Sequence, residues 1–154
     1  MVLNDFVTTK APNIPEILVG KLTMTANYEL TDKEVRIFGL ALNAISHKLN
    51  QDNINKNDLT NVNVIFTKDG NFAMHQDILS AFASHFSLAV YQLENLRKTN
   101  NERFILFAFV EELVHHYWRI ENETEVKYKV LEIVQLIDTR ITLEMVKGWG
   151  VNGL

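Results

Sequence analysis

One stretch organises this chain: Phe104-Ile105-Leu106-Phe107-Ala108-Phe109-Val110-Glu111-Glu112-Leu113-Val114-His115-His116. It begins with an uninterrupted apolar run, which favours a buried segment, and it ends with paired glutamates and paired histidines. Successive residues of a helix lie about 100° apart around its axis, so these polar side chains fall within an arc of about 140°. The stretch therefore predicts a buried helix that carries a cluster of carboxylates and imidazoles near its carboxyl end.

Further helices are predicted from their amino-terminal caps. Thr31-Asp32-Lys33-Glu34 is a capping box, in which the side chains of the first and last residues each bind the other's backbone amide. Asn101 caps the central helix, and Asn122 caps the one after it. The predicted helices run over about residues 32–49, 75–98, 102–118, 123–137 and 139–147. The helix over 75–98 is predicted from the helical period of its apolar residues.

Two short strands complete the predicted fold. Residues 21–25 alternate in polarity and are partly β-branched, and residues 62–67 alternate imperfectly. Lys68-Asp69-Gly70 predicts a turn, after which residues 71–74 either pair back as a hairpin or begin the next helix. We therefore expect an α-rich α+β fold with about five helices and a short strand pair or hairpin.

The composition limits the class of protein. A chain of 154 residues, of which 47% are hydrophobic, fits one folded domain. The absence of cysteine excludes disulfides and thiolate ligands. Because the sequence shows neither a signal-peptide pattern nor a membrane-spanning apolar run, we expect a cytoplasmic protein without a membrane contact. The net charge of -4 argues against a nucleic-acid partner.

The ends of the chain differ from its middle. Residues 1–19 hold both prolines and predict an irregular arm, docked through Phe6, Ile17 and Leu18. Residues 20–147 are predicted to form a single helix-rich domain, and residues 148–154 a flexible tail that contains Trp149. If the chain has a protein partner or associates with itself, we expect these two arms to make the contact.

The polar cluster suggests a metal site. Burying two carboxylates without partners costs much free energy. A divalent cation would offset that cost and would explain the neighbouring imidazoles. The helix that follows carries Glu123 on the same side as its apolar residues Val126 and Val130. We therefore expect Glu123 to approach Glu111 and His115 across the helix pair.

The segment Glu111-Glu112-Leu113-Val114-His115 resembles the H-E-x-x-H helix of zincin metallopeptidases, with glutamate in the place of the first histidine. The resemblance extends to Asn122-Glu123-Thr124-Glu125-Val126, where small zincins take a third ligand. It implies a hydrolase domain in which Glu111, His115 and Glu123 bind zinc and Glu112 is the general base on the metal-bound water. We place His116 beside the ligands or as an alternate ligand. The substituted first ligand indicates weaker metal binding and can mark a catalytically degenerate site.

Two alternatives remain open. Glu112-Leu113-Val114-His115 matches the Glu-x-x-His motif of ferritin-like bundles once, so a homodimer would have to supply the second copy. In the other alternative the helix end is exposed, and Glu111–His115 and Glu112–His116 are ordinary surface pairs one turn apart. The chain would then be a non-enzymatic helical interaction or regulatory module without a metal.

Overall fold

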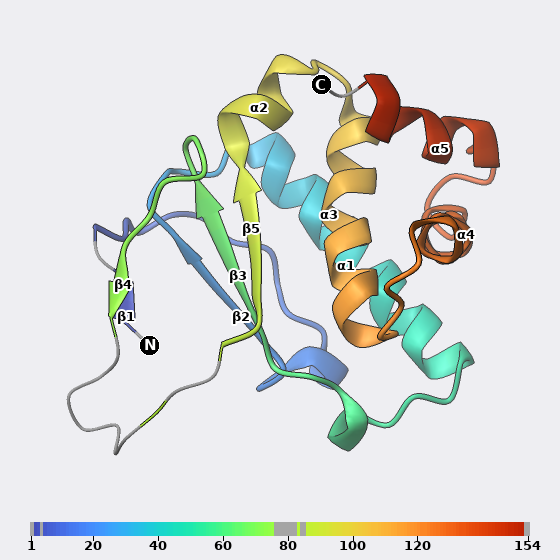
Figure 1. The fold of residues 1–154 in the computed structure, drawn as a ribbon, viewed down its shortest axis with the longest axis horizontal. Helices are drawn as coiled ribbons and strands as arrows, with labels where there is room; N and C mark the ends of the chain where they lie inside the picture. The colour runs from blue at the N-terminus through green and yellow to red at the C-terminus, as the bar shows by residue number, and fades with distance from the viewer. Residues whose placement is uncertain (1, 4, 76–82, 84–85, 153–154) are drawn as a thin grey trace.

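The structure, a computed structural model, describes residues 2–3, 5–75, 83 and 86–152 (Figure 1). Its elements are β1 (Val2–Leu3), β2 (Leu22–Ala26), α1 (Asp32–Gln51), β3 (Val62–Thr67), β4 (Met74–His75), β5 (Leu88–Gln92), α2 (Leu93–Lys98), α3 (Glu102–Tyr117), α4 (Glu123–Val134) and α5 (Leu143–Asn152). Short 3-10 turns cover Glu16–Leu18 and Lys56–Asp58. No helix in these described ranges is long and apolar enough to cross a membrane.

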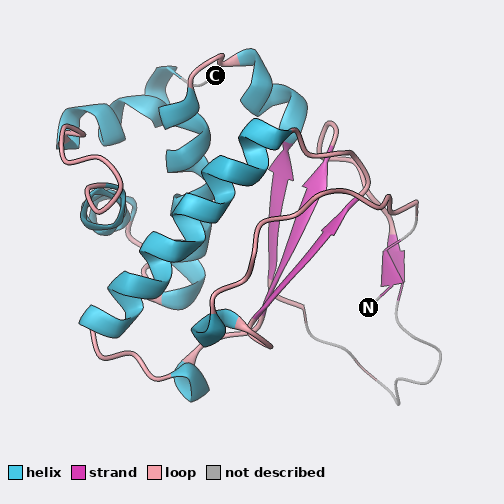
Figure 2. Ribbon diagram, turned by 180° about the vertical axis from the view of Figure 1, so that it is seen from behind, coloured by secondary structure: helices cyan, strands magenta, loops and turns pink. Residues whose placement is uncertain are grey.

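A three-stranded parallel sheet forms one layer and the helices form the other. The strand order is β2-β3-β5, and α1 connects β2 to β3. Figures 1 and 2 show α1 and α3 on one side of this sheet, with the β1–β4 pair on the side away from the helices. Parallel strands need such crossover connections, because a tight turn can join only antiparallel neighbours.

The sheet and helices meet around four stacked aromatic rings. Phe38 of α1 lies 5.2 Å from Phe66 of β3 and 4.4 Å from Phe109 of α3, measured between ring centroids. Tyr91 of β5 stacks on Phe109 at 5.1 Å and donates its hydroxyl to the Phe109 carbonyl at 2.8 Å. Because α3 is packed against both the sheet and α1, it is apolar on nearly all sides up to Val110. This packing fixes the position of Glu111, the next residue.

The predicted starts of α1, α3 and α4 are confirmed. Thr31 and Glu34 form the expected capping box. The Asn101 side chain accepts from the amides of Arg103 and Phe104, and Asn122 accepts from the amide of Glu125. Other helix boundaries differ. The helix α4 ends at Val134 instead of about residue 137, and α5 begins at Leu143 instead of about residue 139. The helix α5 also continues past its predicted end at Lys147 into the segment that was predicted as a flexible tail. Caps are local interactions, whereas helix ends also depend on packing.

The expected strand pair is only partly correct. Residues 62–67 form β3, and the first strand lies one residue later than predicted. Residues 71–74 do not pair back on β3, because β3 lies between two parallel neighbours. Instead Met74 and His75 pair with residues 2 and 3. The fold is thus α+β with a parallel sheet in place of a hairpin.

The helix predicted over residues 75–98 is wrong wherever the structure describes it, except in α2. Residues 88–92 form β5, whose alternate residues Ala89 and Tyr91 are buried. The apolar residues of this segment fit the two-residue period of a strand as well as the period of a helix. Pairing with β3 makes the segment a strand. Residues 76–82 and 84–85 of this predicted helix lie outside the described residues.

The amino-terminal arm docks through two of the three expected contacts. Leu18 is fully buried and Ile17 packs against the core, whereas Phe6 is 67% exposed. The arm also adds an amide-to-carbonyl hydrogen bond of 2.8 Å from Val7 to Ala26 at the end of β2. The side chain of Trp149 is not among those described.

Candidate metal centre

The site lies near the carboxyl-terminal end of α3, where α3 leaves the core and α4 crosses over α3. A short connection reverses the chain between the two helices, with Arg119 in the left-handed region at φ 54°. Asn122 then caps α4, so that Glu123 occupies its first helical position. The connection thereby brings the first turn of α4 over the last turns of α3.

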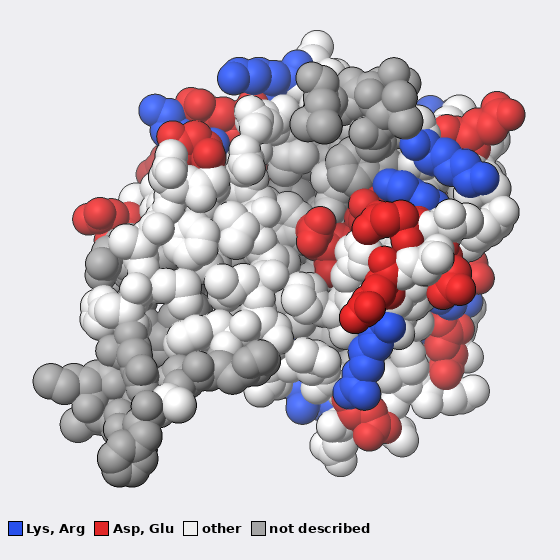
Figure 3. All heavy atoms as spheres, in the orientation of Figure 1, with Lys and Arg blue, Asp and Glu red and all other residues white. Residues whose placement is uncertain are grey.

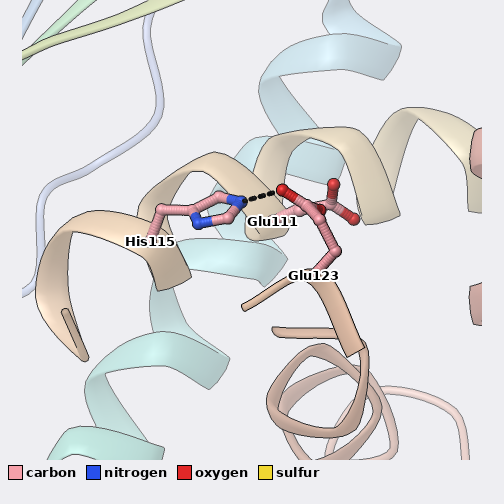
Figure 4. A group of neighbouring side chains, drawn as sticks. All are labelled: Glu111, His115 and Glu123. Carbon is pink, nitrogen blue, oxygen red and sulfur yellow. Dashed lines mark ion pairs between the residues drawn. The ribbon is translucent and has the colours of Figure 1, made fainter. Parts of the chain in front are cut away.

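Three of the residues singled out in the sequence come together there. Glu111, His115 and Glu123 each offer one ligand atom, and these atoms lie within 4.8 Å of one another. The Nε2 atom of His115 is 3.7 Å from Oε1 of Glu123, and Figure 4 shows the two side chains pointing toward each other beside Glu111. This Glu-His-Glu group could hold a metal ion.

The ring of His115 is oriented by the backbone. Its Nδ1 atom lies 2.7 Å from the carbonyl oxygen of Ile120, in the connection between the helices. Because a carbonyl only accepts, Nδ1 donates to it, and in a neutral ring Nε2 then carries the lone pair. A second-nitrogen hydrogen bond of this kind is typical of metal-binding histidines. It aims the basic nitrogen at the two glutamates.

The burial of the group is graded. Glu111 is buried, at 8% exposure, whereas the side chain of His115 is 25% exposed and that of Glu123 is 72% exposed. The group therefore opens to solvent through Glu123. The expectation that Glu123 would approach His115 is met, although Glu123 sits at the rim of the site.

Lys127, which the sequence reasoning missed, supplies a positive charge. Its ammonium forms an ion pair with Oε2 of Glu111, and the two side chains are only 13% and 10% exposed. The burial of Glu111 therefore does not by itself require a divalent cation, which corrects the argument made from the sequence. The signal was present, since Lys127 follows Glu123 by four residues and so lies one turn further along the same side of α4.

Glu112 and His116 lie beside the group. Burial raises the pKa of Glu112, and the negative charges of Glu111 and Glu123 act in the same direction, while His115 and His116 oppose them. The Nε2 atom of His116 lies 3.1 Å from the carbonyl oxygen of Leu88 in β5, so this nitrogen donates to the sheet. His116 is thus directed toward β5 and is not part of the three-residue group.

The far side of α4 carries a separate network of ion pairs. Lys129 contacts Asp52 at 2.9 Å and Glu132 at 2.7 Å, and Lys48 contacts Asp52 at 3.1 Å. The indole of Trp118 donates to the same Asp52 carboxylate at 2.8 Å. This network joins α4 to the end of α1 and holds the helix that presents Glu123 and Lys127.

Acidic residues surround the candidate centre. Figure 3 shows Asp and Glu side chains gathered over the end of α3 and the start of α4, next to a broad uncharged area over the sheet. Besides the residues already described, Glu121 and Glu125 are exposed there. Such a concentration of negative charge attracts cations to this face of the molecule.

Comparison with protein-family models, with curated proteins and with solved structures finds no match. We therefore infer the function from the chemistry of the site.

Proposed function

We propose that this chain binds a divalent metal ion through Glu111, His115 and Glu123, with zinc as the first ion to test. The observation that carries the proposal is the orientation of His115. Its Nδ1 is held by the Ile120 carbonyl, so the Nε2 lone pair points at two carboxylates from different helices. Imidazole and carboxylate ligands suit zinc, and three protein ligands leave a coordination position for water.

The finer proposal is a zincin-like hydrolase. Glu112 follows the first ligand directly, as the general base does in the H-E-x-x-H helix. Its raised pKa suits a group that takes a proton from metal-bound water and passes it on. With glutamate at position 111 in place of histidine, we expect slow hydrolysis or binding without turnover. A cytoplasmic location remains a prediction from the sequence.

Elemental analysis of the purified protein tests the proposal. After incubation with zinc and removal of the excess, we expect one equivalent per chain, lost on treatment with a chelator. His115→Ala and Glu123→Ala should each lower the bound zinc severalfold. Matched controls are His47→Ala, which removes the partner of Gln51 on α1, and Glu125→Ala, which removes an exposed glutamate of α4. Equal zinc in all five proteins would contradict the proposal.

The hydrolase is tested separately with Glu112→Gln. This variant should keep its zinc and lose any hydrolysis of model peptides or esters that the zinc-loaded protein shows. If the zinc-loaded protein hydrolyses nothing, or if Glu112→Gln retains the full rate, the metal site is not a hydrolytic one.

A second candidate function is protein interaction through the amino-terminal arm. It is supported by Phe6, a large apolar side chain that is 67% exposed. If the arm makes such a contact, Phe6→Ser should reduce concentration-dependent self-association on a sizing column. An unchanged elution volume at all concentrations would leave this candidate without support.

A further inference from the structure

We propose that Lys127 is the resident cation of the candidate centre and that a metal ion binds only by displacing its ammonium from Glu111. This inference rests on the proposed metal site and concerns how that site is regulated. In the structure Lys127 and Glu111 form an ion pair between α4 and α3 that is largely removed from solvent.

The position of Lys127 is the first observation that supports this inference. Glu123 and Lys127 are one turn apart on α4, and both side chains face the end of α3. Lys127 therefore reaches into the same group of atoms from which a metal would be bound. A divalent cation at Glu111 would stand a few ångströms from the ammonium, and two cations so close repel each other strongly in a partly buried site.

The second step is the balance of charge. Three carboxylates, those of Glu111, Glu112 and Glu123, act on one another here. His115 and His116 act in the opposite direction, and Lys127 supplies one fixed positive charge. One ammonium does not neutralise three carboxylates, whereas a divalent ion comes closer. The exchange of an ammonium for a divalent ion is thus favoured by the surrounding glutamates, and it is opposed by the loss of the Lys127–Glu111 pair.

The third step is where the ammonium can go. Lys127 has a long flexible stem, and Glu123 beside it is 72% exposed, so the site opens to water on that side. A lysine can keep its stem packed while its charged head moves to solvent. The displaced ammonium therefore needs no new buried partner. The metal-free and metal-bound states differ chiefly in which cation contacts Glu111.

The test compares zinc affinities by titration calorimetry. Lys127→Met removes the competing charge and keeps an unbranched stem, so it should bind zinc about tenfold more tightly than the wild type, or better. Lys129→Met is the matched control, because Lys129 is an equally buried, ion-paired lysine of α4 on the other network. It should bind zinc as the wild type does. Unchanged or weaker binding by Lys127→Met would overturn the inference.

A second measurement uses the wild type alone and covers the case in which Lys127→Met does not fold. Brief acetylation followed by mass spectrometry reports how accessible each lysine is. Saturating zinc should raise the labelling of Lys127 severalfold and leave that of Lys129 unchanged. If zinc binds but Lys127 stays protected, the displacement idea is wrong and the metal site stands. If neither the wild type nor Lys127→Met binds zinc, the proposed function itself fails.

Discussion

Two buried glutamates of this molecule, Glu34 and Glu111, differ in the hydrogen-bond partners and charged groups around their carboxylates. Each is almost removed from solvent, at 2% and 8% exposure, and each forms an ion pair with a residue distant in the sequence. Glu34 lies at the start of α1 and pairs with Arg97 of α2, whereas Glu111 lies near the end of α3 and pairs with Lys127 of α4. Their residue type and burial are alike, so any difference in role must come from their neighbours.

The carboxylate of Glu34 is saturated. Both of its oxygens accept from the Arg97 guanidinium, at 2.8 and 2.7 Å, and Oε1 also accepts from the Thr31 amide at 2.9 Å. Burial opposes its ionisation, but these hydrogen bonds outweigh burial and hold the pKa of Glu34 below its ordinary value. The planar guanidinium matches the carboxylate in a fixed geometry. This arrangement is structural.

The surroundings of Glu111 carry excess negative charge and a basic nitrogen. Its partner Lys127 is a compact point charge on a flexible stem, without the fixed fork of arginine. Glu112, Glu123 and the oriented His115 lie beside it. The comparison teaches that burial of a glutamate does not identify a metal site. The relevant observations are the balance of charge and the direction of the imidazole.

The largest effect should come from removing Glu34. Glu34→Ala deletes half of the capping box and leaves the Arg97 guanidinium without its carboxylate, so unfolding in urea should show a loss of about 3 kcal/mol. Zinc affinity should not change. Arg36→Gln, which breaks an exposed pair with Glu102, serves as a control and should cost less than about 0.5 kcal/mol. A loss of similar size in both variants would remove the distinction drawn here.

Replacing each pair by methionines should separate the two regions further. In metal-free protein, Glu111→Met/Lys127→Met should lie within about 1 kcal/mol of the wild type, because apolar residues can replace a buried ion pair at little net cost. Glu34→Met/Arg97→Met should remain at least about 2 kcal/mol less stable, because the Thr31 amide also loses its acceptor. Chemical denaturation of both double variants measures which of the two ion pairs contributes more to the free energy of unfolding.

The helix caps provide a smaller and more selective change. Asn101→Ala and Asn122→Ala should each cost about 1 kcal/mol, since each removes one side-chain cap. Only Asn122→Ala loosens the first turn of α4, which presents Glu123, so only this variant should weaken zinc binding. Equal zinc affinities in a calorimetric titration of the two variants would show that the position of Glu123 does not matter.

The smallest expected effect is a pH dependence at Glu112. Because its pKa is raised in the folded protein, its ionisation lowers stability as the pH rises above the ordinary value of 4.5. In the presence of a chelator, Glu112→Gln should therefore be more stable than the wild type at pH 7, with the difference vanishing near pH 4. Thermal melts across this range measure it. A variant less stable at pH 7 would reverse the sign and show that the charged form is stabilised.

Much of this comparison could be predicted from local sequence. The capping box of Thr31 and Glu34 and the caps Asn101 and Asn122 were predicted, because each depends on residues within one turn. The approach of Glu123 to His115 followed from helix periodicity. These features are encoded by spacing along a single element or a short connection.

The rest depends on contacts between distant segments. The strand of residues 88–92 is stabilised by pairing with β3, and neither its period nor its neighbours in sequence distinguished it from a helix. Arg97 reaches Glu34 only because α2 follows that strand. Lys127 and Lys129 carry the same charge and lie two residues apart in the sequence, but only the fold shows that they point to different networks.

The most direct test of the account is a crystal of the protein grown with zinc and measured at the zinc absorption edge. We predict one strong anomalous peak within bonding distance of His115 Nε2 and of carboxylate oxygens of Glu111 and Glu123, with the Lys127 ammonium moved away from Glu111. A structure in which Lys127 still contacts Glu111 and zinc is absent, or is bound elsewhere, would contradict it.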